Sequence, residues 1–221
     1  MKKAFTLAEV IITLMILGVI AVVTVPGLLQ KTYDKETITQ VKAAYSMLSR
    51  AMARAVGENG PVSQWEWHTG SQSGNNRDNR KSFMKVLIQY MNVKKYCGSA
   101  TCFPNNYGGS GVAGYPLDLR GNKYTNGGSI EGFHDGKTIL NNGMYLMVWN
   151  GYSQHSETVA NIVVDINGAQ GPNRIGYDWF HFTVGQTRIA PTTSNDCYKN
   201  ANYGWGCSKY VIDNGNMNYK Y

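Results

Sequence analysis

A long apolar run near the start of the chain constrains the fold most. From Phe5 to Leu29 the residues are apolar except for a few polar side chains: Thr6, Glu9, Thr13 and Thr24. Phe5 to Val25 is long enough to cross a bilayer as a helix, at 1.5 Å per residue across about 30 Å of hydrocarbon. Lys2 and Lys3 precede the run and are expected to stay in the cytoplasm, which places the rest of the chain outside. A cleaved signal peptide fits less well, because the run is long and no A-x-A site follows it.

Glu9 is the most informative residue in this run. A carboxylate costs about 2.5–3.5 kcal/mol at the centre of a bilayer and less near the interface, so it usually has a partner. No Lys, Arg or His lies between Phe5 and Gln30. We therefore expect the partner to come from another chain or from an amine released by cleavage. The alternative is a plain signal anchor in which the glutamate has no role.

The segment Lys2-Lys3-Ala4-Phe5-Thr6-Leu7-Ala8-Glu9 resembles the N-terminal signature of type IV prepilins and type II secretion pseudopilins. The resemblance implies that prepilin peptidase cuts between Ala4 and Phe5 and that the new amine of Phe5 is methylated. Glu9 becomes the fifth mature residue and pairs with such an amine on a neighbouring subunit inside an apolar filament core. Gly18 and Pro26 match positions where the family tolerates a weakened or kinked helix. Ala4 departs from the pattern, because the family usually has glycine there.

Helical periodicity continues from Gln30 to Val56. One apolar stripe recurs at spacings of three and four: Val41, Ala44, Tyr45, Leu48, Ala51, Met52 and Ala55. Gly57 and Asn59-Gly60-Pro61 end the pattern. The two segments together predict one helix of about 50 residues, with a break at Pro26-Gly27 as the alternative. The predicted organisation is a leader at 1–4, a transmembrane and assembly helix at 5–29, its amphipathic continuation at 30–57, and a globular extracytoplasmic head at 58–221.

The head is expected to be α+β, with a small antiparallel sheet packed on the long helix. Residues 58–80 look like a surface loop, 82–93 like a second helix, and the segment from Cys97 to Gly114 like a loop. Strands are predicted at 137–140 and 144–149, joined by the hairpin turn Asn141-Asn142-Gly143, and again at 161–166 and 178–184. These make about four strands.

The four cysteines form two local pairs, Cys97 with Cys102 and Cys197 with Cys207. In an exported chain an even number of cysteines indicates disulfides. Three connectivities exist for four cysteines, and the two local bridges are preferred because short loops close easily. Buried free thiols and a zinc site are the alternatives. Zinc is disfavoured, since neither spacing is C-x-x-C and no His lies near either pair.

Asp165, Asn167 and Asp178 are candidate calcium ligands. Alternating Asp and Asn oxygens with glycines between them suit a calcium loop, although the bidentate Glu of an EF-hand is missing. The alternative is a turn between two strands, where Asp, Asn, Gly and Pro are the usual residues.

Catalytic motifs are not found, so we do not expect an enzyme. The sequence has no H-E-x-x-H, no G-x-S-x-G, and no Walker or dinucleotide glycine pattern. The expected function is a structural subunit of a type IV pilus or type II pseudopilus, which starts in the bacterial inner membrane and polymerises with other pilin-like subunits.

The alternative is a membrane-anchored tip protein that binds DNA, a glycan or a secreted substrate. The net charge of +7 permits an anionic partner. The side chains of Trp65, Trp67, Arg77 and Arg80 would then stack on bases or sugars. Such aromatic residues also commonly belong to a core.

Overall fold

Helix α1 (Leu7–Asn59) is a single helix of 53 residues in this computed structural model, with Pro26 inside it. The structure describes residues 6–65, 77–101, 103–104, 108–109, 112–125, 135–151 and 155–221. The chain divides into two units, Met1–Glu36 and Thr37–Tyr221, and α1 contributes to both. The prediction of one long helix is confirmed. The alternative break at Pro26-Gly27 is not seen, although proline removes a backbone hydrogen bond at that turn.

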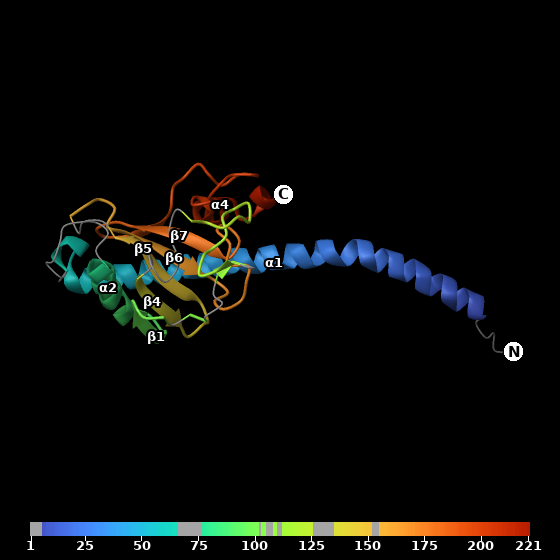
Figure 1. The fold of residues 1–221 in the computed structure, drawn as a ribbon, viewed down its shortest axis with the longest axis horizontal. Coiled ribbons are helices and arrows are strands. Elements are labelled where there is room, and N and C mark those ends of the chain that lie inside the picture. Colours follow the sequence, from blue (N-terminus) through green and yellow to red (C-terminus); the bar gives the residue numbers. More distant parts are fainter. Residues whose placement is uncertain are drawn as a thin grey trace. The chain divides into compact units, whose positions relative to one another are not determined.

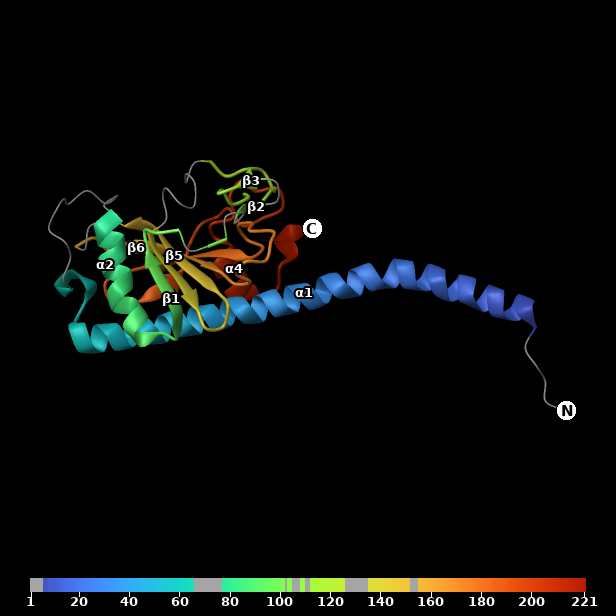
Figure 2. The ribbon, with the colours of Figure 1, turned by 60° about the horizontal axis from the view of Figure 1, so that its bottom comes forward.

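A six-stranded antiparallel sheet forms the centre of the second unit (Figures 1 and 2). Its strand order is β1-β4-β5-β6-β7-β8. The strands are β1 (Val93–Gly98), β4 (Asp135–Leu140), β5 (Tyr145–Gly151), β6 (Ala160–Asp165), β7 (Trp179–Val184) and β8 (Ile189–Pro191). A separate two-stranded ribbon is made by β2 (Gly108–Gly109) and β3 (Val112–Ala113). The α+β prediction is confirmed, and the four predicted strands are the central strands β4 to β7.

The β4–β5 hairpin has the predicted turn. Ile139 pairs with Tyr145, the N–H of Gly143 donates to the carbonyl of Leu140 at 3.1 Å, and Gly143 has φ +89°. The side-chain oxygen of Asn142 accepts the N–H of Met144 at 3.2 Å. Asn and Gly tolerate this left-handed turn, which is why the sequence predicts it well.

One face of the sheet packs against the second half of α1. The buried α1 side chains follow the predicted stripe: Thr37, Val41, Ala44, Leu48, Ala51, Met52 and Ala55. The six apolar ones share a core with alternate residues of β5, β6 and β7, including Leu146, Ile162 and Phe182. Tyr45, half-buried at the edge of the stripe, stacks on Phe182 with ring centroids 6.1 Å apart. The 3.6-residue period of the helix and the two-residue period of the strands therefore meet in one core.

The opposite face of the sheet carries a second, aromatic cluster. Met147 of β5, Val163 of β6 and Trp179 of β7 point to this face and are covered by Phe103 and Tyr124 from the preceding loops. Further out, the rings of Trp149 and Trp205 stack at 4.3 Å. Both faces of the sheet are therefore covered, in contrast to an antiparallel sheet that leaves one face to water.

The predictions for three segments before β4, the loop at 58–80, the helix at 82–93 and the loop at 97–114, are wrong in part. The second helix, α2, runs over Arg77–Leu87 and is followed by the 3-10 turn η2 (Ile88–Tyr90), rather than spanning 82–93. Its first turn includes Arg80, which is buried and forms an ion pair with Asp135 at 3.0 Å. A polar first turn hid the start of the helix from a hydrophobic pattern. The predicted loop at Cys97 is in fact the end of edge strand β1.

Three further short helices belong to the part of the second unit that the structure describes. They are the 3-10 turn η1 (Val62–Gln64), helix α4 (Cys207–Asn214) and the 3-10 turn η3 (Asn218–Lys220). Helix α4 packs against β7 and β8. The C-terminal end is held where the hydroxyl of Tyr219 donates to the carbonyl of Gly176.

Candidate assembly site

The first half of α1 presents an apolar surface that nothing in the described chain covers. From Leu7 to Leu29 its large apolar side chains are between 43% (Val10) and 77% (Leu7) exposed. The most apolar window of 18 residues has a mean hydropathy of 2.6. By length and composition α1 is the one described helix able to cross a membrane, a property that a signal sequence shares.

The exposed side chains lie on all sides of the helix rather than along one stripe. A helix that is hydrophobic all round is normally enclosed by a protein core or by a membrane. This half of α1 is therefore suited by length and composition to apolar surroundings such as a membrane.

Glu9 closes a capping box at the start of this surface. Its Oε2 accepts the backbone N–H and the hydroxyl of Thr6, both at 2.8 Å. In return the N–H of Glu9 donates to the Thr6 hydroxyl oxygen at 3.3 Å. Thr6 is the N-cap and Glu9 the third helical residue, so the reciprocal bonds satisfy two N–H groups that a helix start leaves unpaired.

The role of Thr6 was not predicted, although its signal was present. A Thr followed three residues later by Glu, immediately before an apolar run, is the pattern of a capping box. Glu9 therefore has a neutral partner in its own chain, in addition to any cation it meets in another. Ala4 and Phe5, the predicted processing and methylation sites, lie outside the described residues, and both remain predictions.

Asp165 and Asp178, two of the candidate calcium ligands, are fully buried acceptors of protein hydrogen bonds. Oδ1 of Asp165 accepts the backbone N–H groups of Asn167 at 3.1 Å and Gly168 at 2.9 Å, and Oδ2 accepts Nε1 of Trp179 at 3.1 Å.

Asp178 holds the other side of the same turn. It accepts the backbone N–H groups of Asn173 at 2.7 Å and Arg174 at 2.5 Å, and the side-chain amide of Asn167 at 3.3 Å. These bonds are those of a turn between β6 and β7, the alternative interpretation of this stretch.

Burial raises the pKa of Asp178 to about 6, more than these hydrogen bonds lower it. Among the described residues no group of three or more His, Cys, Asp or Glu side chains is arranged to hold a metal ion. Oδ1 of Asn167 is buried and accepts no hydrogen bond from the residues that the structure describes. Calcium binding at Asp165, Asn167 and Asp178 stays a prediction, and a cation there would compete with the hydrogen bonds of both carboxylates.

The predicted disulfide between Cys197 and Cys207 is confirmed. It joins the segment after β8 to the first residue of α4. Cys97 is also disulfide-bonded, and its predicted partner Cys102 lies outside the described residues.

The aromatic and basic residues considered for nucleic acid or glycan binding are structural where they are described. Trp65 is buried, stacks on Phe83 at 5.7 Å and donates its ring N–H to the carbonyl of Gly60. Arg80 is buried in its ion pair with Asp135 and also donates to the carbonyl of Trp149 at 3.0 Å. Neither side chain is placed to meet a ligand. Trp67 and the side chain of Arg77 lie outside what the structure describes.

Comparison with known families gives one match, to a family of unknown function (DUF6613), over residues 27–105. The match covers the second half of α1, α2 and β1, and it does not reach the apolar start of the chain or the central strands. No curated protein and no solved structure matches the chain. The arrangement itself, a long N-terminal helix packed on an antiparallel sheet, is a pilin-like architecture.

Proposed function

We propose that this chain is a pilin-like structural subunit. In this proposal prepilin peptidase removes residues 1–4 in the bacterial inner membrane, the amine of Phe5 is methylated, and the subunit joins a filament of the type IV pilus or type II pseudopilus kind. The head, outside the cytoplasm, is a structural and not a catalytic part.

The exposed apolar half of α1 carries the proposal. Its large apolar side chains are uncovered from Leu7 to Leu29, while the same helix supplies six residues to the core of the second unit. A bilayer covers such a surface before assembly, and the equivalent helices of neighbouring subunits cover it afterwards. An ordinary signal anchor needs only the bilayer.

Glu9 adds a reason to expect that neighbouring subunits cover this helix. A lone carboxylate near the start of an apolar helix favours partners that bring a cation, and the methylated amine of a neighbouring Phe5 is such a group. The Thr6 capping box holds the carboxylate close to the helix end, where that amine would be presented.

Intact-mass analysis of the full chain tests the processing step. The chain is expressed in a bacterial membrane with and without a prepilin peptidase, extracted, and fragmented from its N-terminus. We expect a chain that begins at Phe5 and carries one extra methyl group only when the peptidase is present. Ala4→Gly, which restores the residue usual in the family, is the matched variant and is expected to be cleaved at least as fast.

Two results would count against the proposal. Retention of residues 1–4 in both the natural chain and Ala4→Gly would indicate a plain membrane anchor. A chain that begins beyond Leu29 would show that the apolar run is removed as a signal sequence.

A further inference from the structure

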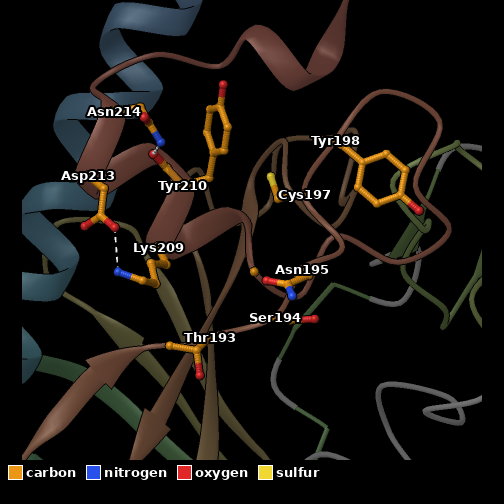
Figure 3. Close-up of a pocket in the computed structure, with 10 residues that line it drawn as sticks. Thr193, Ser194, Asn195, Cys197, Tyr198, Lys209, Tyr210, Asp213 and Asn214 are labelled. Carbon is orange, nitrogen blue, oxygen red and sulfur yellow. Dashed lines mark hydrogen bonds and ion pairs between the residues drawn. The ribbon is translucent and has the colours of Figure 1, made fainter.

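A cleft of about 420 Å³ lies between helix α4 and the segment that leads from β8 towards it (Figure 3). The segment contributes Asn195 and Tyr198, and the helix contributes Lys209, Asp213 and Asn214. The volume is within the range of small-molecule sites, which starts at about 300 Å³. No residue of this cleft takes part in the assembly site.

The two walls of the cleft are fixed to each other. The Cys197–Cys207 disulfide joins the segment directly to the start of α4. Beside it, the carboxylate of Asp196 accepts the backbone N–H groups of Trp205 at 3.0 Å and Gly206 at 2.8 Å. Gly206 also lies so close to the carbonyl of Ser194 that a Cβ would collide with it. The cleft is therefore formed before any ligand arrives, which reduces the entropic cost of binding.

The lining disfavours two classes of ligand. Its ten residues include no Leu, Ile, Val, Met or Phe, so an acyl chain or an aliphatic peptide side chain would meet none of these side chains to pack on. Its only charged side chains, Lys209 and Asp213, form an ion pair with each other at 2.5 Å. A phosphate or a nucleic acid would meet no net positive charge there.

Tyr198 indicates which class of ligand fits the cleft once apolar and anionic ligands are set aside. Among the described residues of Thr37–Tyr221, Tyr198 at 59% and Tyr221 at 54% are the two large apolar side chains exposed to this degree, and Tyr198 is the one that lines the cleft. Most of the other aromatic rings that the structure describes are buried or partly buried, so a ring exposed to this degree beside a preformed cleft is an exception that a ligand would explain.

We infer that this cleft binds a neutral saccharide. The C–H face of a sugar ring packs on the exposed ring of Tyr198. Its hydroxyl groups both donate and accept, which matches the amide of Asn195, the side-chain oxygen of Asn214, whose amide nitrogen donates to the carbonyl of Tyr210, and the paired charges of Lys209 and Asp213. This goes beyond the proposed function, because it gives the head a ligand whether or not the chain enters a filament.

The test uses the full chain in lipid nanodiscs free of glycolipid, because maltoside and glucoside detergents would themselves occupy a sugar site. Maltose, cellobiose, lactose and N,N′-diacetylchitobiose are titrated by saturation-transfer NMR up to about 10 mM, a range that detects millimolar dissociation constants. Inorganic phosphate is titrated in parallel as an anionic probe.

Three variants test whether the ring of Tyr198 contacts the sugar. Tyr198→Ala removes the ring and is expected to weaken binding about tenfold or more. Tyr198→Phe keeps the ring, and Tyr221→Ala removes an equally exposed tyrosine elsewhere, so both are expected to bind within about twofold of the natural chain. Tyr198 is exposed, so these changes leave the core intact.

Binding of at least one disaccharide with this pattern supports the inference. Binding of none of the four, equal weakening by Tyr198→Ala and Tyr221→Ala, or a preference for phosphate overturns it. Because binding is measured on the chain in nanodiscs, failure here is separate from failure of processing or assembly.

Discussion

Glu9 has two separable roles, as a helix cap and as a charge, and three substitutions distinguish them. Glu9→Gln keeps the capping box, since Gln also accepts the Thr6 N–H, but it removes the charge. Thr6→Ala keeps the charge and removes the cap. Glu9→Leu removes both.

The expected magnitudes differ enough to be measured. Loss of an N-cap costs about 0.5–2 kcal/mol, and here the lost bonds are those between Thr6 and Glu9. Loss of one partner from a charge pair enclosed in an apolar filament core costs about 3–5 kcal/mol, because the remaining cation is left unpaired. At 1.4 kcal/mol per factor of ten, these correspond to roughly 2- to 30-fold for the cap and more than about 100-fold for the charge.

The assay compares membrane insertion with filament incorporation in cells that carry the full assembly machinery. All three variants should insert, and the two without a charge should insert at least as well as the natural chain because they bury no carboxylate. Incorporation into sheared filaments should fall strongly for Glu9→Gln and Glu9→Leu and only mildly for Thr6→Ala. If Thr6→Ala is impaired more than Glu9→Gln, the carboxylate acts only as a cap and the pairing argument is refuted.

Two further predictions concern the turn between β6 and β7, both measured by denaturant unfolding of the full chain in nanodiscs. Gly168 has φ +65° and a Cβ there would meet the carbonyl of Gly143, whereas Gly143 has φ +89° and open space. Gly168→Ala should therefore cost about 1–3 kcal/mol more than the matched Gly143→Ala, and equal losses would show that the two turns do not pack against each other. Burial raises the pKa of Asp178 to about 6 from its usual 3.8, so its contribution to the free energy of unfolding is fully present below about pH 4 and is lost as the pH rises through about 6. The change is on the order of 3 kcal/mol, and an unaltered pH profile in Asp178→Asn would contradict this assignment.

The sequence predicted the elements whose patterns are local and strong. The apolar run, the stripe on α1 and the Asn142-Gly143 turn each depend on neighbours within a few residues, and each is found where it was expected. Edge strand β1 was missed because Lys94 and Lys95 interrupt any alternation of apolar and polar residues. Charged side chains of this kind are usual on sheet edges, where they discourage pairing with other chains.

Features assembled from distant residues could not be predicted in this way. The ion pair of Arg80 with Asp135 joins positions 55 residues apart and forms only because α2 packs on β4 and β5. The saccharide cleft depends on the disulfide that brings residues 193–198 against α4, and on a helix of eight residues too short to give a clear period. The capping box is the opposite case, since its two residues are three apart and its pattern is visible once it is looked for.

The two units differ in how they cover their apolar side chains. For this reason the role of Glu9 distinguishes a filament subunit from a plain membrane anchor. The second unit buries apolar residues in two clusters, one on either face of its sheet. The described residues of the first unit leave their large apolar side chains exposed, and in the proposed function a bilayer and then neighbouring subunits cover them. If the helix is surrounded only by lipid, the carboxylate of Glu9 is unfavourable, and its one contribution to stability is the helix cap. In a filament the same carboxylate forms a charge pair, but only with a correctly placed neighbouring subunit. The comparison of Glu9→Gln with Thr6→Ala therefore distinguishes a plain membrane anchor from a filament subunit.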